Sequence, residues 1–206
     1  MSSMSIAERL FLMTFLQSVV VSMASSITVG YEAPDFRLQT ADSKTHQLHE
    51  MRGSVVFLIA GNRKLRKEDN QWGEASVADF KKWINHAQGV APIFRCYIIG
   101  NMDDVPKFIS RQFIKKQLLK KPPPVPLLLD WKGEVHQQYK IECKKRKKPS
   151  LYIVDQQGKV VFHQYSKFNH QTYDKIRQLL RNLLSQSNST DSQKSSRSGV
   201  DLTPSR

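Results

Sequence analysis

The two cysteines carry the most specific chemistry that this sequence offers. Cys96 lies inside the apolar run 94–98, a context that predicts a buried thiol acting as a small hydrophobic side chain. Cys143 precedes the cationic run 144–148, and nearby cations favour a thiolate. Cys143 is therefore our candidate catalytic residue, and an exposed cysteine of ordinary reactivity is the other interpretation. The chain has no CxxC motif, and a single pair of cysteines does not identify the redox compartment.

Lysine and arginine dominate the charge of the chain. The 32 basic and 18 acidic residues give a formal net charge of +14, and the pI is about 9.9, which favours acidic partners. The basic groups 63–67 and 144–148, and a further one at 107–121, are either a solvated surface or an anion-binding surface for phosphate, lipid head groups or nucleic acid. No RNA-binding signature or aromatic platform accompanies the lysines, so specific nucleic-acid recognition has little support. The predicted binding residues are Arg63, Lys64, Arg66, Lys67, Lys144, Lys145, Arg146, Lys147 and Pro149.

Histidine and carboxylate spacing does not predict a metal centre. His46 and His49 lie three positions apart, but no cysteine or further histidine is near them in the sequence. Asp103 and Asp104 are interpreted as helix caps. We expect neither a metal nor a cofactor.

The N-terminal residues have the pattern of a targeting segment. The run 10–23 is mostly apolar, too short to span a bilayer comfortably and suited to the core of a signal peptide, and small residues follow it. Residues 1–26 are therefore either a cleaved export signal or a retained amphipathic anchor. We expect an exported protein, periplasmic or secreted, whose mature chain has no transmembrane span; a retained segment would associate it with the membrane.

Alternation of strand and helix patterns predicts one α/β domain over 27–184. Short β-rich runs are typical of buried strands, and apolar residues at helical spacing predict helices. The polar composition after 184 predicts a disordered tail at 185–206. The expected strands are 54–60, 93–100, 125–129, 150–154 and 159–164, and the expected helices are 72–88, one that starts at 103 or 104 and ends before 122, a helical turn at 134–139, and 170–184.

The order of these elements predicts a mixed central sheet with helices on both faces. Strands that alternate with helices pair in parallel through right-handed crossovers, and the hairpin at 150–164 adds an antiparallel edge. This is the element order of a thioredoxin-like three-layer sandwich.

Several motifs resemble the redoxin group of the thioredoxin-like superfamily, which includes the peroxiredoxins. The opening Gly30-x-x-Ala33-Pro34-Asp35-Phe36 is similar to that of the group, and 149–160 is similar to its cis-proline strand and hairpin. A closer resemblance is to the YtfJ family of bacterial periplasmic proteins, carried by 59–63 with Lys67 and Asn70, and by 101–104. The resemblance implies a thioredoxin-like fold, export to the periplasm, and a cis-proline loop, holding Cys143 and Pro149, that faces the usual catalytic position.

The loop after the first buried strand departs from that pattern. Thioredoxins place CxxC there and peroxiredoxins place Thr-x-x-Cys, whereas the run 61–69 of this chain contains no cysteine, serine or threonine. Our first hypothesis is therefore an exported, non-catalytic binding module for a protein or an anionic ligand. The second is a thiol oxidoreductase or peroxiredoxin-like protein that uses Cys143. The third is a basic surface that docks to an anionic polymer or membrane.

Overall fold

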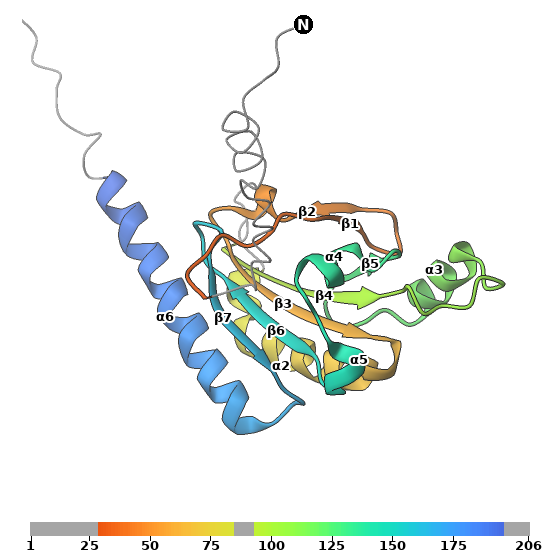
Figure 1. Ribbon diagram of the computed structural model, residues 1–206. Coiled ribbons are helices and arrows are strands. Elements are labelled where there is room, and N and C mark those ends of the chain that lie inside the picture. Colours follow the sequence, from red (N-terminus) through yellow and green to blue (C-terminus); the bar gives the residue numbers. More distant parts are fainter. Residues whose placement is uncertain (1–28, 85–92, 196–206) are drawn as a thin grey trace, which may run out of the picture.

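The computed structural model describes residues 29–84 and 93–195 (Figure 1). These residues form a seven-stranded mixed sheet with the order β2-β1-β5-β4-β3-β6-β7 and helices on both faces. The expected three-layer α/β sandwich is confirmed. The predicted segment 1–26 and the end of the predicted tail, 196–206, lie outside the described residues.

The element labels follow Figure 1. The strands are β1 (Arg37–Gln39), β2 (Thr45–Gln47), β3 (Val55–Asn62), β4 (Phe94–Asn101), β5 (Leu127–Asp130), β6 (Ser150–Val154) and β7 (Val160–Tyr165). The helices are η1 (His49–Met51), η2 (Arg63–Leu65), α2 (Arg66–Ile84), α3 (Arg111–Lys120), α4 (Glu134–Gln138), α5 (Cys143–Arg146) and α6 (His170–Ser195).

Strand β3 lies at the centre of the sheet. All eight of its residues are buried, and it pairs in parallel with β4 and antiparallel with β6. The run 55–60 is apolar and contains two valines and an isoleucine, which suits a strand covered on both faces. The carboxyl end of β3 therefore lies between two hydrogen-bonded neighbours.

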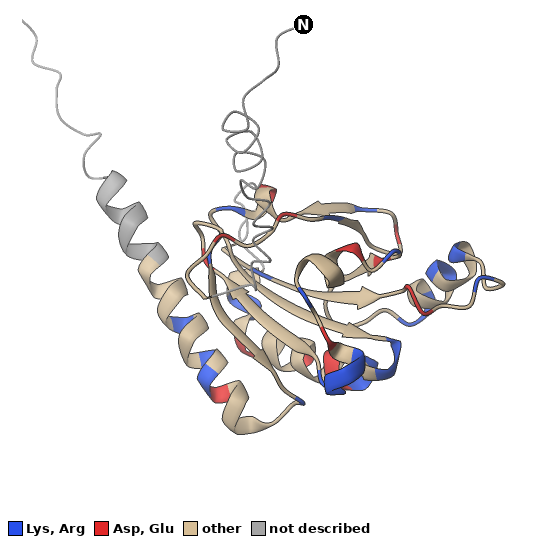
Figure 2. Cartoon of the chain, in the orientation of Figure 1, with Lys and Arg blue, Asp and Glu red and all other residues tan. Residues whose placement is uncertain are grey.

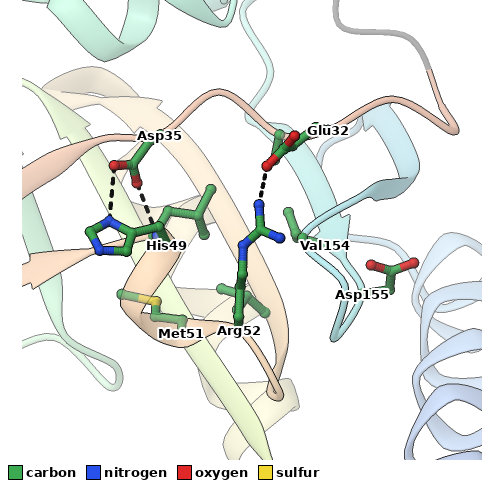
Figure 3. Close-up of a pocket in the computed structure, with 11 residues that line it drawn as sticks. Glu32, Asp35, His49, Met51, Arg52, Val154 and Asp155 are labelled. Carbon is green, nitrogen blue, oxygen red and sulfur yellow. Dashed lines mark hydrogen bonds and ion pairs between the residues drawn. The ribbon is translucent and has the colours of Figure 1, made fainter.

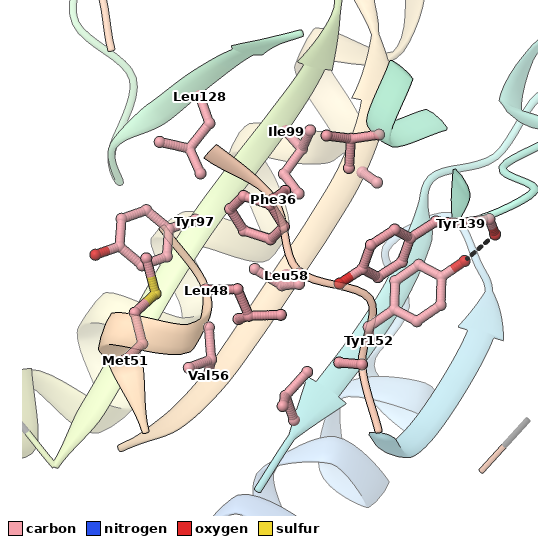
Figure 4. Close-up of a cluster of buried hydrophobic side chains, with 14 of the residues drawn as sticks. Phe36, Leu48, Met51, Val56, Leu58, Tyr97, Ile99, Leu128, Tyr139 and Tyr152 are labelled. Carbon is pink, nitrogen blue, oxygen red and sulfur yellow. Dashed lines mark hydrogen bonds between the residues drawn. The ribbon is translucent and has the colours of Figure 1, made fainter. Parts of the chain in front are cut away.

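Each face of the sheet has its own hydrophobic core. Helices α2 and α6 cover one face, where Trp72 is fully buried and its ring lies 5.0 Å from that of Phe168. The other face is covered by α4 and by the segment before β3, through residues such as Phe36, Leu48 and Tyr139 (Figure 4). Burial on both faces fixes the positions of the strand ends.

Two helices begin at different residues from those predicted. Helix α2 starts at Arg66, inside the expected polar loop, because Leu65 and Trp72 are buried against the body. Helix α3 starts at Arg111 and not at Asp103 or Asp104: the Ser110 hydroxyl accepts a hydrogen bond from the Phe113 amide, 3.2 Å away. Only part of the expected helix 72–88 can be compared, since 85–92 lie outside the described residues.

Other differences lie at the edges of the domain. The β1–β2 hairpin was not predicted, because its three-residue strands contain no apolar run. Helix α6 continues to Ser195, beyond the expected end at Leu184. The hairpin predicted at 150–164 is present as β6 and β7.

Candidate functional site

The loop after strand β3 is basic. Strand β3 ends at Asn62, η2 follows, and α2 starts at Arg66. The Asn62 side chain caps this turn by accepting a hydrogen bond from the Lys64 amide at 2.9 Å. The side chains that emerge here into solvent are Arg63, Lys64, Arg66 and Lys67.

Helix α5 brings the second predicted basic group to the same end of β3. Its first residue, Cys143, donates a hydrogen bond from its thiol to the Ala60 carbonyl at 3.1 Å. In Figure 2 the blue of Lys and Arg residues covers much of α5 and the start of α2. The structure thus brings together two basic segments that lie far apart in the sequence. The exposed cations from α5 and the residue after it are Lys144, Lys145, Arg146 and Lys147.

The Cys143 thiol does not have the environment expected from its cationic neighbours. Only 3% of Cys143 is exposed, and burial raises the pKa of its thiol to about 12. The expectation of an exposed or activated thiol is therefore wrong. The neighbouring cations extend into solvent, so the loss of hydration at the sulfur decides the direction of the pKa.

Cys96 is the buried core thiol that its apolar context predicts. It lies on β4 against α2, and burial raises the pKa of its thiol to about 12 as well. Cys96 is opposite Phe57 in the β3–β4 register, whereas the Cys143 thiol contacts Ala60, three residues further along β3. Phe57 and Ala60 are about 10 Å apart along the strand. Both thiols are free.

Pro149 also differs from its predicted role. It is buried, and its carbonyl accepts a hydrogen bond from the Ser166 amide at 3.1 Å. Among the described residues no peptide bond is cis, which corrects the expected cis-proline loop. Pro149 is therefore held inside the domain, and the surrounding lysines form the accessible surface.

A polar cleft of ≈ 730 Å³ opens beside α4 and α5 at the carboxyl ends of β3 and β4. Asn62 and Asn101 are opposite each other in the β3–β4 register and both line it. Each uses its side-chain oxygen to accept a backbone N–H, from Lys64 at 2.9 Å and from Asp103 at 2.8 Å. Each side chain also has an NH₂ group that can donate a hydrogen bond. The rest of the lining is Asp103, Gly133, His136, Gln137, Lys140, Ile141, Glu142, Cys143, Lys144 and Lys145.

A buried Asp–His pair, which the sequence analysis did not identify, supports this cleft. The His136 ring lies with Nδ1 2.9 Å from the Asp130 carboxylate and Nε2 3.0 Å from the Gly61 carbonyl. Both ring nitrogens are thus engaged, and His136 orients α4 and does not serve as a free base. Burial would raise the pKa of Asp130, but hydrogen bonds from the His136 side chain and backbone outweigh it and lower the pKa.

Ion pairs neutralise part of the basic surface. Lys144 pairs with Asp103 at 3.0 Å, and Glu142 pairs with Lys145 at 3.5 Å and with Arg146 at 3.2 Å. Lys64, Lys67 and Lys147 form no ion pair with any described residue, so their charge is available to a partner.

A second hollow lies at the opposite end of β3 and is too small for a ligand (Figure 3). Its volume is ≈ 30 Å³, about the share of one water molecule in the liquid. Asp35 and His49 pair beside it at 3.2 Å, and Arg52 pairs with Glu32. These contacts attach the segment before β1 to the body of the domain.

In the two described segments, 29–84 and 93–195, no three His, Cys, Asp or Glu side chains gather as a metal site. Within the same segments no helix is long and apolar enough to cross a bilayer.

Comparison with known proteins identifies the family. The family model described as "AhpC/TSA family" matches residues 29–163. No curated protein matches.

Several solved structures are similar to this domain. Their sequence identities are below 25%, so the likeness is one of fold alone. The thioredoxin domain of a thiol-disulfide oxidoreductase from Bacteroides vulgatus is 17% identical, with a TM-score of 0.55 over 75% of this chain and 99% of that one. An exposed lipoprotein thioredoxin from Streptococcus pneumoniae is 20% identical, with a TM-score of 0.51 over 73% and 100%. A peroxiredoxin-like protein from Aquifex aeolicus is 15% identical, with a TM-score of 0.54 over 78% and 90%.

The strand order, the two helical layers and these likenesses agree on a thioredoxin-like fold. Since the family model covers more than half of the sequence, the chain is a member of the AhpC/TSA family of redoxins.

Proposed function

We propose that this protein is a non-catalytic redoxin that binds an acidic segment of a partner protein at the polar cleft. The observation that carries the proposal is the chemistry at the carboxyl end of β3. No sulfur lies in the loop there, and the Cys143 thiol below it is buried with its pKa raised to about 12. Disulfide exchange and peroxide reduction both start from an accessible thiolate, so these reactions lack their nucleophile.

The same surface has the groups that bind carboxylates. Asn62 and Asn101 line the cleft, and each side chain has an NH₂ group that can donate a hydrogen bond. Lys64 and Lys67 follow Asn62 in η2 and α2, Lys147 follows α5, and all three are exposed and form no ion pair among the described residues. Complementary charge steers encounter and fixes orientation, and exposed lysines also tolerate variation in the partner. A cleft of ≈ 730 Å³ accommodates several side chains of an extended peptide.

Binding is tested with a synthetic peptide rich in glutamate and a matched peptide rich in lysine. We expect saturable binding of the acidic peptide that weakens as salt rises, and no binding of the basic peptide. The variant Lys64→Glu/Lys67→Glu/Lys147→Glu should bind the acidic peptide about tenfold more weakly or worse. The matched control Lys159→Glu/Lys175→Glu/Arg181→Glu changes the net charge equally in the β6–β7 turn and on α6, and it should bind as the wild type does.

Equal weakening in both triple variants would show that only net charge matters and would refute the assignment to the cleft. Catalysis is tested separately by insulin reduction and by peroxide consumption with an added dithiol. We expect no turnover above that of Cys96→Ser/Cys143→Ser. Turnover that Cys143→Ser alone abolishes would replace the proposal with the thiol oxidoreductase hypothesis.

We also propose that the chain is exported. The apolar run 10–23 and the resemblance to the YtfJ family support export, and the name of the exposed lipoprotein thioredoxin agrees with it. Expression of the full chain in a bacterial host should give a periplasmic or secreted product whose N-terminal sequence begins near residue 25. A full-length product confined to the cytosol would contradict export.

A further inference from the structure

A third cavity, different from the polar cleft and from the small hollow near Asp35, lies between α3 and the sheet. Its volume is ≈ 230 Å³, and Ile98 of β4 and Leu127 of β5 are among its lining residues. Helix α3 extends away from the body in Figure 1, and none of its residues is buried. Its apolar side chains therefore border a space that the protein does not fill. The other apolar lining residues are Met102, Val105, Ile109, Phe113, Ile114, Leu118 and Pro123.

Two glycines make room for this cavity. Gly61 and Gly100 are opposite each other in the β3–β4 register. A Cβ atom on Gly100 would lie 3.1 Å from a Leu127 methyl group, so a larger residue would crowd the cavity floor. A Cβ atom on Gly61 would collide with the carboxyl group of Asp69, which takes the space over that glycine.

Asp69 is a buried carboxyl group without a full set of partners. It is 3% exposed, it lines the cavity, and its Oδ1 atom has no hydrogen-bond partner among the described residues. Burial, with a smaller contribution from the Glu68 charge, raises its pKa well above the usual value. A buried polar atom left unsatisfied is costly, and such groups in native proteins call for an explanation. A ligand oxygen in the cavity would supply the missing partner.

Most polar residues of the cavity come from the end of β3, η2 and the start of α2, and Gln117 of α3 is the exception. Arg63, Arg66, Asp69 and Asn70 come from η2 and the first turns of α2, and Arg66 also donates to the Lys121 carbonyl at 3.3 Å. The apolar lining belongs to β4, β5, α3 and the loops beside α3. The cavity therefore has a cationic, hydrogen-bonding end and an apolar end.

We propose that this cavity binds a small amphiphilic carboxylic acid, with its apolar body under α3 and its carboxylate between Asp69 and the arginines. Arg63 and Arg66 supply charge complementarity, and the Asp69 carboxyl group, whose Oδ1 lacks a partner, donates a hydrogen bond to a ligand oxygen in its protonated form. The volume lies just below the usual range for drug-sized ligands, which sets the size at about ten non-hydrogen atoms. This site shares only Asn62 with the lining of the polar cleft, and its proposed ligand contacts do not include Asn62, so either proposal can fail without the other.

The test uses octanoate, with octylamine and octanol as probes that change only the head group. Titration is followed by calorimetry and by amide shifts in two-dimensional NMR. We expect one octanoate per chain, shifts at α3 and β5, and binding of octylamine and octanol at least about tenfold weaker. No saturable octanoate binding in the millimolar range, or equal binding of octylamine, would overturn the proposal.

Two matched variants place the ligand. Leu118→Trp fills the cavity from α3, whereas Leu119→Trp puts the same ring on a side chain that is 55% exposed. We expect octanoate affinity to fall about tenfold or more in Leu118→Trp and to stay unchanged in Leu119→Trp. Equal affinity in both would refute the location. If Leu118→Trp does not fold, Ile114→Phe occupies the same cavity and decides the question.

The head-group contacts are tested by Arg66→Gln and Asp69→Ala. Each removes one hydrogen-bonding partner and should weaken octanoate about five- to tenfold while leaving octanol binding unchanged. Unchanged octanoate affinity in both variants would refute the proposed orientation.

Discussion

The buried pair of Asp130 and His136 gives a prediction whose size follows from the contacts. The side chains are 2% and 4% exposed, and Asp130 Oδ2 accepts from the His136 ring at 2.9 Å and from its backbone amide at 3.0 Å. Asp130→Ala leaves both buried donors without an acceptor. Each hydrogen bond to a charged group contributes about 1.5–3 kcal/mol, so the free energy of unfolding should fall by about 3–5 kcal/mol. Asp130→Asn keeps one acceptor oxygen and should lose about half as much.

The measurement is urea unfolding at neutral pH, followed by the fluorescence of the tryptophans, one of which, Trp72, is fully buried. For a domain of this size the Asp130→Ala loss corresponds to a Tm lower by about 6–20 °C. Asp155 provides the control, because its carboxylate also accepts two backbone amides, from Gln157 at 3.0 Å and Lys159 at 2.8 Å, but in a surface turn. Asp155→Ala should cost about 1 kcal/mol or less.

The pH dependence checks the same reasoning. The folded pKa of Asp130 is lowered, so its contribution is complete above the unfolded value of about 4 and is lost as pH falls through the folded value. The difference between wild type and Asp130→Asn should therefore shrink in acid. An Asp130→Ala loss below about 1 kcal/mol, or a wild-type to Asp130→Asn difference that does not change between neutral and acidic pH, would refute this account.

Three further predictions concern buried residues. Trp72→Ala should lower the free energy of unfolding by about 3–5 kcal/mol, measured by urea unfolding followed by circular dichroism, because the fully buried indole leaves a large cavity; a loss below about 1 kcal/mol would contradict its packing. Cys96 and Cys143 should resist iodoacetamide near pH 8 in the folded protein and react once it is unfolded, since burial raises both thiol pKa values to about 12; rapid native labelling would contradict this. Asp69→Asn should raise the free energy of unfolding at neutral pH but not below about pH 4. The pKa of Asp69 is raised in the folded protein, so above about pH 4 ionisation favours the unfolded chain, and asparagine removes this penalty. Equal effects of the substitution in urea unfolding at both pH values would contradict this.

The central strands and the last helix could be predicted because their patterns are local. The run 55–60 is a continuous apolar segment bounded by turn residues, and β3 forms there. Tyr173, Ile176 and Leu180 recur at helical spacing and are buried in α6. The β1–β2 hairpin could not be found this way, because three-residue edge strands carry too few side chains for a period to show.

The helix expected before residue 122 is present as α3, but the sequence did not indicate how exposed this region is. Phe108 and Phe113 are 88% and 54% exposed. Hydrophobic spacing predicts a helix but does not show whether a neighbouring surface is close enough to cover it.

The candidate site depended on contacts between distant parts of the chain. Cys143 is adjacent to lysines in sequence, but its thiol points at the Ala60 carbonyl, and only the fold reveals that burial. Asp130 at the end of an apolar run, with His136 six residues later, was the available signal for the buried pair. Asp69 had no such signal, because its unusual position depends on the missing side chain of Gly61.

The two-sided pairing of β3 has a consequence for every stability measurement proposed above. Its amides are hydrogen-bonded within a sheet that is covered on both faces, so no small opening of a loop or a helix end exposes them. Deuterium should therefore replace their protons only when the whole domain opens. The slowest exchanging amides in β3 then report the global free energy of unfolding in plain buffer, without any denaturant extrapolation.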